Sequence, residues 1–166
     1  MTTLRPIRRA TIAAACALAV TFSLAAAAED MSAFATASYV RGLRTPEMMH
    51  KIDTDGDGTV SRDEWIAYQE KVFAMLDKDR SGQVDAKQFI SPSGGDLSGF
   101  ATGGFARGLR TAEMMHKIDA DGDGKVSHDE FIAYQARIFD LMDTSTTHHG
   151  SLGKQEMLAT GGANTR

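Results

Sequence analysis

The sequence is poor in cysteine: Cys16 is the only one among 166 residues. A chain with a single thiol cannot form an internal disulfide, so a disulfide-stapled scaffold is excluded. Cys16 also lies in an N-terminal segment that we expect to be removed. The remaining chain then has no thiol at all, which excludes a thiol enzyme.

Basic residues are outnumbered as well. The 18 Lys and Arg residues face 22 Asp and Glu residues, which gives a net charge of −4. Arg5, Arg8 and Arg9 lie in an N-terminal segment without acidic residues, so the charge of residues 29–166 becomes −7 once these three are removed. Nucleic-acid binding needs Lys and Arg to displace phosphate counterions. The balance therefore argues against a nucleic-acid partner and fits a protein that receives cations.

Common catalytic motifs are missing too. The sequence has no nucleophile–base set, no phosphate-binding glycine loop and no His-Glu-x-x-His segment. Glu47 with His50, and Glu113 with His116, form Glu-x-x-His pairs such as helices contribute to di-iron sites, but the further inward glutamates of such a site are not evident. We therefore expect a binding protein and not an enzyme.

A long apolar run occurs only near the N-terminus. Three arginines precede an apolar stretch over residues 10–24, and four alanines end at Ala28. This pattern is typical of a secretory signal, and the run is shorter than the roughly 20 residues of a membrane-spanning helix. Lipoprotein processing at Cys16 is the alternative, although the apolar stretch before it is short. We expect residues 1–28 to be a signal peptide, and the mature chain to be periplasmic or secreted, without a membrane span.

The rest of the sequence is duplicated with an offset of 66 residues. Residues 41–53 recur with one substitution at residues 107–119. A turn-rich stretch, Ser-Pro-Ser-Gly-Gly-Asp, lies between the copies. We therefore expect one unit over residues 29–90, a second over 105–166, and a linker over 91–104.

Each unit contains one loop of the pattern Asp-x-Asp-x-Asp-Gly-x5-Glu, at residues 53–64 and 119–130. Ca²⁺ takes about six to eight oxygen ligands, which such a loop supplies from positions 1, 3, 5, 7, 9 and 12 around a glycine turn. A solvated turn would have no need for glutamate and an apolar residue at fixed positions in both copies. The predicted ligands are Asp53, Asp55, Asp57, the Thr59 carbonyl, Ser61 and Glu64 in the first loop, and Asp119, Asp121, Asp123, the Lys125 carbonyl, Ser127 and Glu130 in the second.

A weaker loop follows each strong one. Residues 77–88 keep the glycine and the apolar plug, but they end in Gln88, whose single neutral carbonyl oxygen should lower the affinity for Ca²⁺. Residues 143–156 fit the pattern only with two extra residues before Gly150, so we expect no calcium there. The predicted ligands of the weaker metal site are Asp77, Asp79, Ser81, the Gln83 carbonyl, Asp85 and Gln88.

These loops, and the helices expected around them, resemble the EF-hand superfamily. Apolar residues stand one, four and five positions before each loop, on one helix face, and one follows each loop. The resemblance implies an all-α fold of tandem EF-hand (helix–loop–helix) repeats, with four hands in two duplicated units, and Ca²⁺ as the bound ion. Residues 31–44 and 98–110 show no clear periodicity, so their structure stays open.

The loops of one unit start only 24 residues apart, from Asp53 to Asp77 and from Asp119 to Asp143. One helix, at about residues 62–78, must therefore end one hand and begin the next. At 1.5 Å per residue it is about 25 Å long and holds its loops at opposite ends. We expect each loop to pair with a loop of the other unit.

The short spacing resembles small secreted bacterial EF-hand proteins, including lanthanide binders of the lanmodulin type. Loops of that type carry proline at the second position and aspartate at the ninth. Here no second position is proline, and only Asp85 matches at the ninth, so Ca²⁺ is favoured. Three roles stay open: a calcium buffer, a sensor with an unidentified protein partner, and a calcium-stabilised interaction module. The methionines could form a surface that a sensor exposes when calcium binds, but they lie at core-facing positions, which favours a place in the core.

Overall fold

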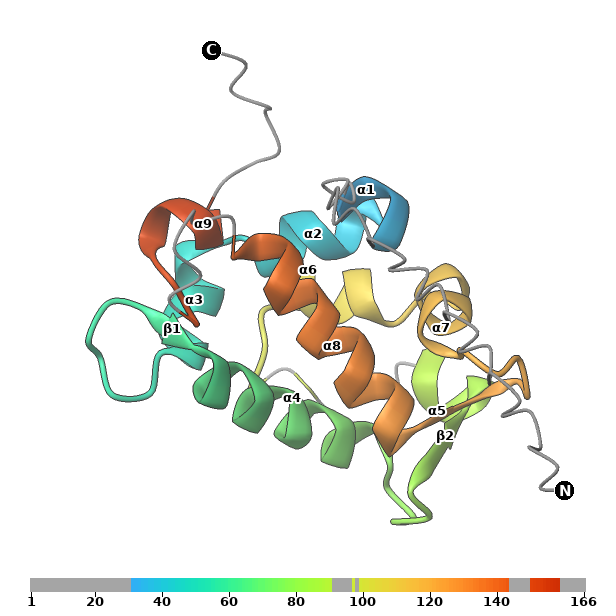
Figure 1. The fold of residues 1–166 in the computed structure, drawn as a ribbon. Coiled ribbons are helices and arrows are strands. Elements are labelled where there is room, and N and C mark those ends of the chain that lie inside the picture. The colour runs from blue at the N-terminus through green and yellow to red at the C-terminus, as the bar shows by residue number, and fades with distance from the viewer. Residues whose placement is uncertain (1–30, 91–96, 98, 144–149, 159–166) are drawn as a thin grey trace, which may run out of the picture.

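The computed structural model describes residues 31–90, 97, 99–143 and 150–158 (Figure 1). Helices predominate there, as expected, and four short strands accompany them. The predicted signal peptide lies outside the described part. No helix within that part is long and apolar enough to cross a membrane. The elements in chain order are α1 (Met31–Phe34), α2 (Ala37–Leu43), α3 (Pro46–Ile52), β1 (Val60–Ser61), α4 (Arg62–Leu76), β2 (Gln83–Asp85), α5 (Ala86–Ile90), α6 (Gly103–Leu109), α7 (Ala112–Ile118), β3 (Lys125–Ser127), α8 (His128–Met142), β4 (Ser151–Leu152) and α9 (Lys154–Leu158).

Two 15-residue helices, α4 and α8, pack against each other at the centre of the fold (Figure 1). Each begins with a capping box, in which a serine side chain accepts a hydrogen bond from the backbone of a glutamate and the glutamate side chain accepts one in return. The pairs are Ser61 with Glu64 and Ser127 with Glu130. α4 connects the first two loops, and α8 the last two, as the 24-residue spacing predicted.

The short strands join loops from different units. β1 pairs antiparallel with β4, which places Val60 opposite Leu152, and β2 pairs with β3, which places Val84 opposite Val126. All four of these side chains are fully buried. The two ladders lie toward opposite ends of α4 (Figure 1). The structure thus confirms that each loop pairs with one of the other unit: the first with the fourth, and the second with the third.

The helix positions predicted to be apolar all face the core. The residues one, four and five positions before each loop are at most 8% exposed, and those that follow the loops are 0% exposed. One contiguous cluster of buried side chains includes residues of both repeats. The units predicted over residues 29–90 and 105–166 therefore share a single hydrophobic core.

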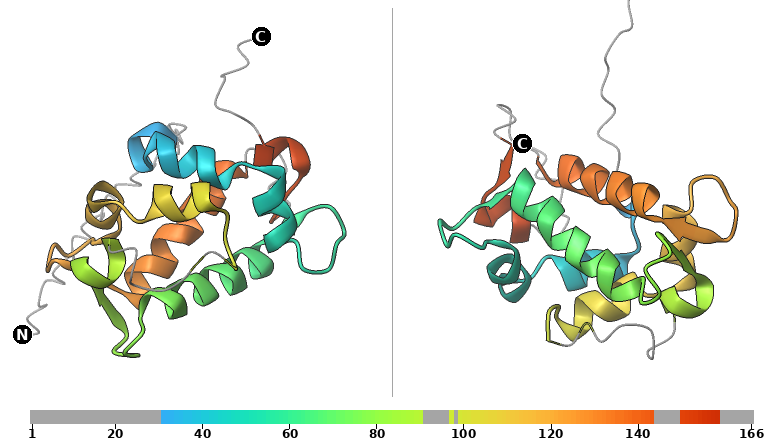
Figure 2. Two further views of the ribbon diagram at one scale, coloured as in Figure 1. Left: turned by 180° about the vertical axis from the view of Figure 1, so that it is seen from behind. Right: turned by 90° about the horizontal axis from the view of Figure 1, so that it is seen from below.

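Three helices, α1, α2 and α6, occur where the sequence shows no periodicity. α2 and α6 each begin at a threonine N-cap and cross at very close range (Figure 2). A Cβ atom added to Gly42 would lie 2.5 Å from the carbonyl carbon of Gly104, and one added to Gly108 would lie 2.6 Å from the carbonyl oxygen of Ser38. Glycine is therefore required at Gly42 and Gly108, and the crossing ties the two repeats together.

The segment before each of these helices lies against the long helix of the other repeat. Phe34 stacks on Tyr134 with ring centroids 4.6 Å apart, and the Tyr134 hydroxyl donates a 2.8 Å hydrogen bond to the Phe34 carbonyl. Phe100 stacks on Tyr68 at 4.6 Å in the same way. Phe100 belongs to the predicted linker, 91–104. Part of that linker thus packs on the core, and α6 begins inside it.

Two buried glutamines at equivalent positions of α4 and α8 differ in their partners. The side-chain oxygen of Gln135 accepts a 2.7 Å hydrogen bond from the Tyr39 hydroxyl. Phe105 stands at the position of Tyr39 in the second repeat and has no hydroxyl. Gln69 is 0% exposed, and both of its amide atoms lack a hydrogen-bond partner among the described residues. Divergence of the repeats has therefore left an unpaired amide in the core.

Replacement of Gln69 should accordingly stabilise the protein. Gln69→Leu removes two unpaired buried polar atoms, and we expect the free energy of unfolding to rise by about 1 kcal/mol. Gln135→Leu is the matched control: it leaves the buried Tyr39 hydroxyl without an acceptor, so the free energy of unfolding should fall by about 1–2 kcal/mol. Urea unfolding of calcium-free protein measures both changes. Equal losses from the two substitutions would contradict this description of the core.

Candidate metal sites

The first predicted loop folds around the carboxylate of Asp53. Its two oxygens accept hydrogen bonds of 2.7 Å from the backbone NH of Gly56 and 3.0 Å from that of Gly58. Both glycines have a left-handed φ, +73° and +86°, which glycine adopts without steric cost. Oxygens of Asp53, Asp55 and Asp57 lie within 4.8 Å of one another, close enough to share one cation. The loop's other predicted ligands are the Thr59 carbonyl, Ser61 and Glu64.

Glu64, the predicted bidentate ligand, reaches back across this loop. One of its oxygens accepts hydrogen bonds from the backbone NH of Thr54 at 2.7 Å and of Asp55 at 3.3 Å, and the other accepts one from Ser61 at 2.9 Å. Partial burial opposes ionisation of Glu64, but the hydrogen bonds outweigh burial and lower its pKa to about 2. The carboxylate is thus ionised and already held against the loop that it is predicted to close.

The second strong loop repeats this geometry. Asp119 accepts hydrogen bonds of 2.8 and 3.0 Å from Gly122 and Gly124, which also have left-handed φ angles. Oxygens of Asp119, Asp121 and Glu130 lie within 4.8 Å of one another. Partial burial opposes ionisation of Glu130, but hydrogen bonds from the loop outweigh it and lower its pKa. The loop's other predicted ligands are Asp123, the Lys125 carbonyl and Ser127.

The weaker loop keeps the turn but closes with an amide. Asp77 accepts hydrogen bonds from the backbone NH of Ser81 at 3.0 Å and of Gly82 at 2.8 Å. At the last position, the side-chain oxygen of Gln88 accepts a 3.0 Å hydrogen bond from the NH of Asp85. Gln88 therefore takes the place of the capping glutamate without its charge. The loop's other predicted ligands are Asp79 and the Gln83 carbonyl.

Charge also separates the weaker loop from the strong ones. Residues 77–88 contain three acidic and three basic residues, whereas residues 53–64 and 119–130 each contain five acidic residues and one Lys or Arg. Arg80 has a left-handed φ of +56° at a position where the strong loops have glycine, and such a conformation is strained for arginine. Within the described residues, close groups of three potential ligands occur in the strong loops and not in 77–88. These differences agree with the predicted ranking.

The fourth loop is described only at its two ends, because residues 144–149 lie outside the described part; the adjacent histidines at 148 and 149 are among them. Gly150 has a left-handed φ of +67°, and Leu152 is fully buried in the β1–β4 ladder. A side-chain oxygen of Glu156 accepts a 3.0 Å hydrogen bond from the NH of Gly153. The alignment of these residues with the turn, the plug and the last position therefore agrees with the structure.

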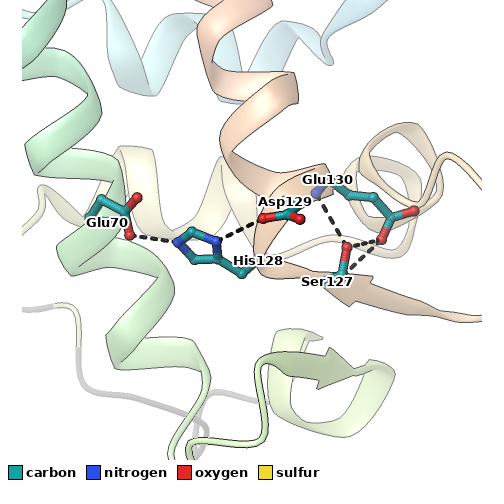
Figure 3. A network of polar contacts seen from close by, with 5 residues as sticks. All are labelled: Glu70, Ser127, His128, Asp129 and Glu130. Atoms are coloured by element: carbon teal, nitrogen blue, oxygen red, sulfur yellow. Dashed lines mark hydrogen bonds and ion pairs between the residues drawn. The ribbon is translucent and has the colours of Figure 1, made fainter.

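Sequence reasoning missed a contact between the strong loop at 119–130 and α4. His128, the first residue of α8, forms a 2.7 Å contact with Glu70 through Nε2 and a 3.2 Å contact with Asp129 through Nδ1 (Figure 3). The hydrogen bond to Glu70 raises the pKa of His128, partial burial opposes this, and the bond to Asp129 adds to the rise. Arg62 occupies the equivalent position of α4 and forms an ion pair with Asp140 of α8. The 66-residue offset of the duplication relates Arg62 to His128, and this was the signal in the sequence that could have pointed to the contact.

The Glu-x-x-His pairs lie on the surface. Glu47 and Glu113 are exposed in the first turns of α3 and α7, and His50 and His116 are exposed in the last turns. Acidic residues in a first turn complement the helix dipole. The two pairs thus occupy the outer faces of short helices.

Comparison with known proteins identifies the class of these loops. A family model of an EF-hand domain pair matches residues 67–136, and a model of the EF hand matches residues 47–67. The matches cover the first three loops, so the chain contains EF-hand domains. The domain-pair match spans the second and third loops, which are the ones that β2 and β3 join.

The chain is also similar in sequence to several known proteins. It is 35% identical to a calcineurin B protein of Naegleria gruberi over 89 residues, which are 48% of this chain and 47% of that protein. It is 43% identical to human parvalbumin alpha over 67 residues, 37% of this chain and 53% of that protein. It is 29% identical to a 16 kDa calcium-binding protein of Schistosoma mansoni over 104 residues, 53% of this chain and 66% of that protein. The chain thus spans about half the length of the first two. Its EF hands and acidic loops indicate that it binds Ca²⁺.

Loss of the last ligand should disable a strong site. Glu64→Gln removes one charge and one ligand oxygen, and we expect the affinity of loop 53–64 for Ca²⁺ to fall by about tenfold or more. Loop 119–130 should keep most of its affinity, because it pairs with the second loop and not with the first. Titration calorimetry of residues 29–166 checks both effects. Unchanged affinity in the Glu64→Gln variant would contradict the assignment of this ligand.

The reverse change should strengthen the weak site. Gln88→Glu supplies the bidentate carboxylate that loop 77–88 lacks, so its calcium affinity should rise by about tenfold. Gln155→Glu makes the same chemical change at an exposed position of α9, outside the first three loops, and serves as the matched control. If both variants bind calcium like the parent protein, the argument from the last loop position is wrong for this chain.

Proposed function

We propose that this protein is an exported calcium buffer with four EF hands in two duplicated units. In this proposal, residues 53–64 and 119–130 are the strong sites, residues 77–88 form a weak site, and residues 143–156 act as a structural partner for the first loop. The protein acts by binding ions and not by catalysis. Residues 1–28 direct it to the periplasm or the exterior.

Burial of the methionines carries the choice of a buffer. Calcium sensors expose a methionine-rich groove when calcium binds, and that groove receives a partner. Here Met48 and Met114 are 0% exposed, while Met49 is 8% and Met115 is 5% exposed. All four are covered by other parts of the same chain.

Contacts of the sulfur atoms support this interpretation. The Met114 sulfur accepts a 3.5 Å hydrogen bond from the backbone NH of Thr36, and the Met48 sulfur accepts one of 3.4 Å from Thr102. Each bond links the two repeats. To expose these side chains, the protein would have to break contacts between its own halves.

The closing glutamates support a buffer for a second reason. Glu64 and Glu130 already bond across their loops in the described structure, so little movement separates them from a ligating position. Trp65, next to Glu64, is fully buried and donates a 2.8 Å hydrogen bond to the Gln135 carbonyl of α8. This bond resists a large displacement of α4.

A sensor, or a calcium-stabilised interaction module, is the second candidate. The observation in its favour is the exposure of Met75 at 42% and Ile90 at 38%, the large apolar side chains that stand out from the described surface. Lanthanide binding is the alternative for the ion. Ser61 and Ser127 at the ninth loop positions provide a hydroxyl where loops of the lanmodulin type have a carboxylate, so we favour Ca²⁺.

Calcium titration of residues 29–166 after chelator treatment tests the proposal. A buffer should bind two ions strongly and at most one weakly, with a higher melting temperature by mass action and little change in Trp65 emission or in the binding of a hydrophobic dye. A rise in dye binding on calcium addition would favour the sensor. Tight lanthanide binding with weak calcium binding would overturn the choice of ion, and absence of calcium binding would overturn the proposal as a whole.

A further inference from the structure

We infer that Lys125 makes the two strong sites unequal, because its ammonium group weakens calcium binding in loop 119–130 relative to loop 53–64. The inference rests on the proposed function, in which both loops bind Ca²⁺. It assigns a role to a side chain that is not itself a ligand, since only the backbone carbonyl of Lys125 is predicted to touch the ion.

The two loops are otherwise closely matched. Each has aspartate at positions 1, 3 and 5, serine at position 9 and glutamate at position 12, with left-handed glycines at positions 4 and 6. Their shared hydrogen bonds agree within about 0.2 Å: Gly58 to Asp53 and Gly124 to Asp119 are both 3.0 Å. A difference in affinity therefore comes either from the loop residues that differ or from the partner loops, which are the fourth loop for 53–64 and the second loop for 119–130.

Three positions differ in their side chains in a way that affects hydrogen bonding or charge: Thr54 against Ala120, Thr59 against Lys125, and Arg62 against His128. The positive charge of Arg62 is matched by its ion pair with Asp140, on the other long helix. His128 in turn contacts two carboxylates. Neither residue leaves an uncompensated positive charge beside its loop.

Lys125 lacks such compensation. Its Nζ donates a 3.1 Å hydrogen bond to the side-chain oxygen of Gln83, a neutral amide, and forms no ion pair with a carboxylate of the described residues. Thr59, at the same position of the first loop, is neutral and donates a 2.8 Å hydrogen bond to Asp57. Lys125 is thus the main difference in fixed charge between the two strong sites.

The β2–β3 ladder holds the backbone of Lys125 beside the partner loop, where Lys125 pairs with Asp85. The Asp85 carboxylate accepts a 2.8 Å hydrogen bond from the backbone NH of Gln88, whereas the Lys125 ammonium bonds to the neutral Gln83 amide. The partner loop adds no net negative charge, because its three acidic and three basic residues balance. The ammonium thus bonds at the ladder that borders loop 119–130, to a neutral group of the partner loop and not to the Asp85 carboxylate.

The expected effect is moderate, because the group is exposed to water. A unit charge that repels a divalent cation through screened solvent should lower affinity by about three- to tenfold. Loop 53–64 then fills first as calcium rises, and loop 119–130 fills over a higher range. A single protein buffers calcium over a wider span of concentration in this way.

Site-resolved NMR titration of residues 29–166 tests the inference. The NH groups of Gly58 and Gly124 bond to a ligand of their own loop, so each reports calcium binding at one site. Lys125→Gln should raise the affinity of loop 119–130 by about three- to tenfold and leave loop 53–64 unchanged, while Thr59→Lys should lower that of loop 53–64. Lys125→Arg keeps the charge and should preserve the gap, that is, the difference in calcium affinity between the two strong loops. Lys71→Gln, the same charge change at an exposed position of α4 outside the loops, is the matched control.

The salt dependence of calcium binding provides an independent test. Because the interaction is electrostatic and exposed, the gap between the sites should narrow from low salt to about 0.5 M monovalent salt in the parent protein and change little in Lys125→Gln. If both loops bind calcium and Lys125→Gln leaves the gap intact, the inference is wrong while the proposed function stands. If neither glycine responds to calcium, the proposed function itself is overturned.

Discussion

The rest of the structure depends on the rigidity of one shared helix. α4 contains 15 residues and joins two loops, so it separates their ends by about 22 Å of helix. A helix of this length cannot fold back, and the two loops that it joins cannot lie side by side. Yet each loop carries an apolar residue at its eighth position that needs a partner. Only the other repeat can supply that partner, and for this reason the β1–β4 and β2–β3 ladders both cross between repeats.

Interlocking of the repeats follows from this constraint. A single repeat would expose Val60 at one end of α4 and Val84 at the other, whereas two antiparallel repeats bury both. The same pairing brings α2 against α6, where Gly42 and Gly108 allow the backbones to touch. The sites are therefore held by a core to which both halves contribute. We expect damage to that crossing to affect all loops together.

Local sequence patterns predicted most of the sites but not all of the fold. The loops, their plugs such as Val84, and the shared helix α4 follow from spacing alone, because ion coordination and helix rise fix the positions of the residues. α2 and α6 could not be predicted in this way. Each has seven residues and a threonine cap, and each is stabilised by a glycine contact with the other repeat that no local pattern records. The strands are also too short to produce an alternating pattern. The contacts of His128 depend on the crossing of α4 and α8, and they were missed for the same reason.

Divergence between the repeats is informative because their backbones are so similar. Gln69 and Gln135 occupy equivalent places, yet only Gln135 has a tyrosine hydroxyl as its partner. Thr59 and Lys125 occupy equivalent places, yet only Lys125 brings a charge to its loop. In a duplicated chain, one repeat is thus an internal control for the other. A lysine beside a calcium ligand opposes the charge of the ion, so its energetic effect depends on what the site binds.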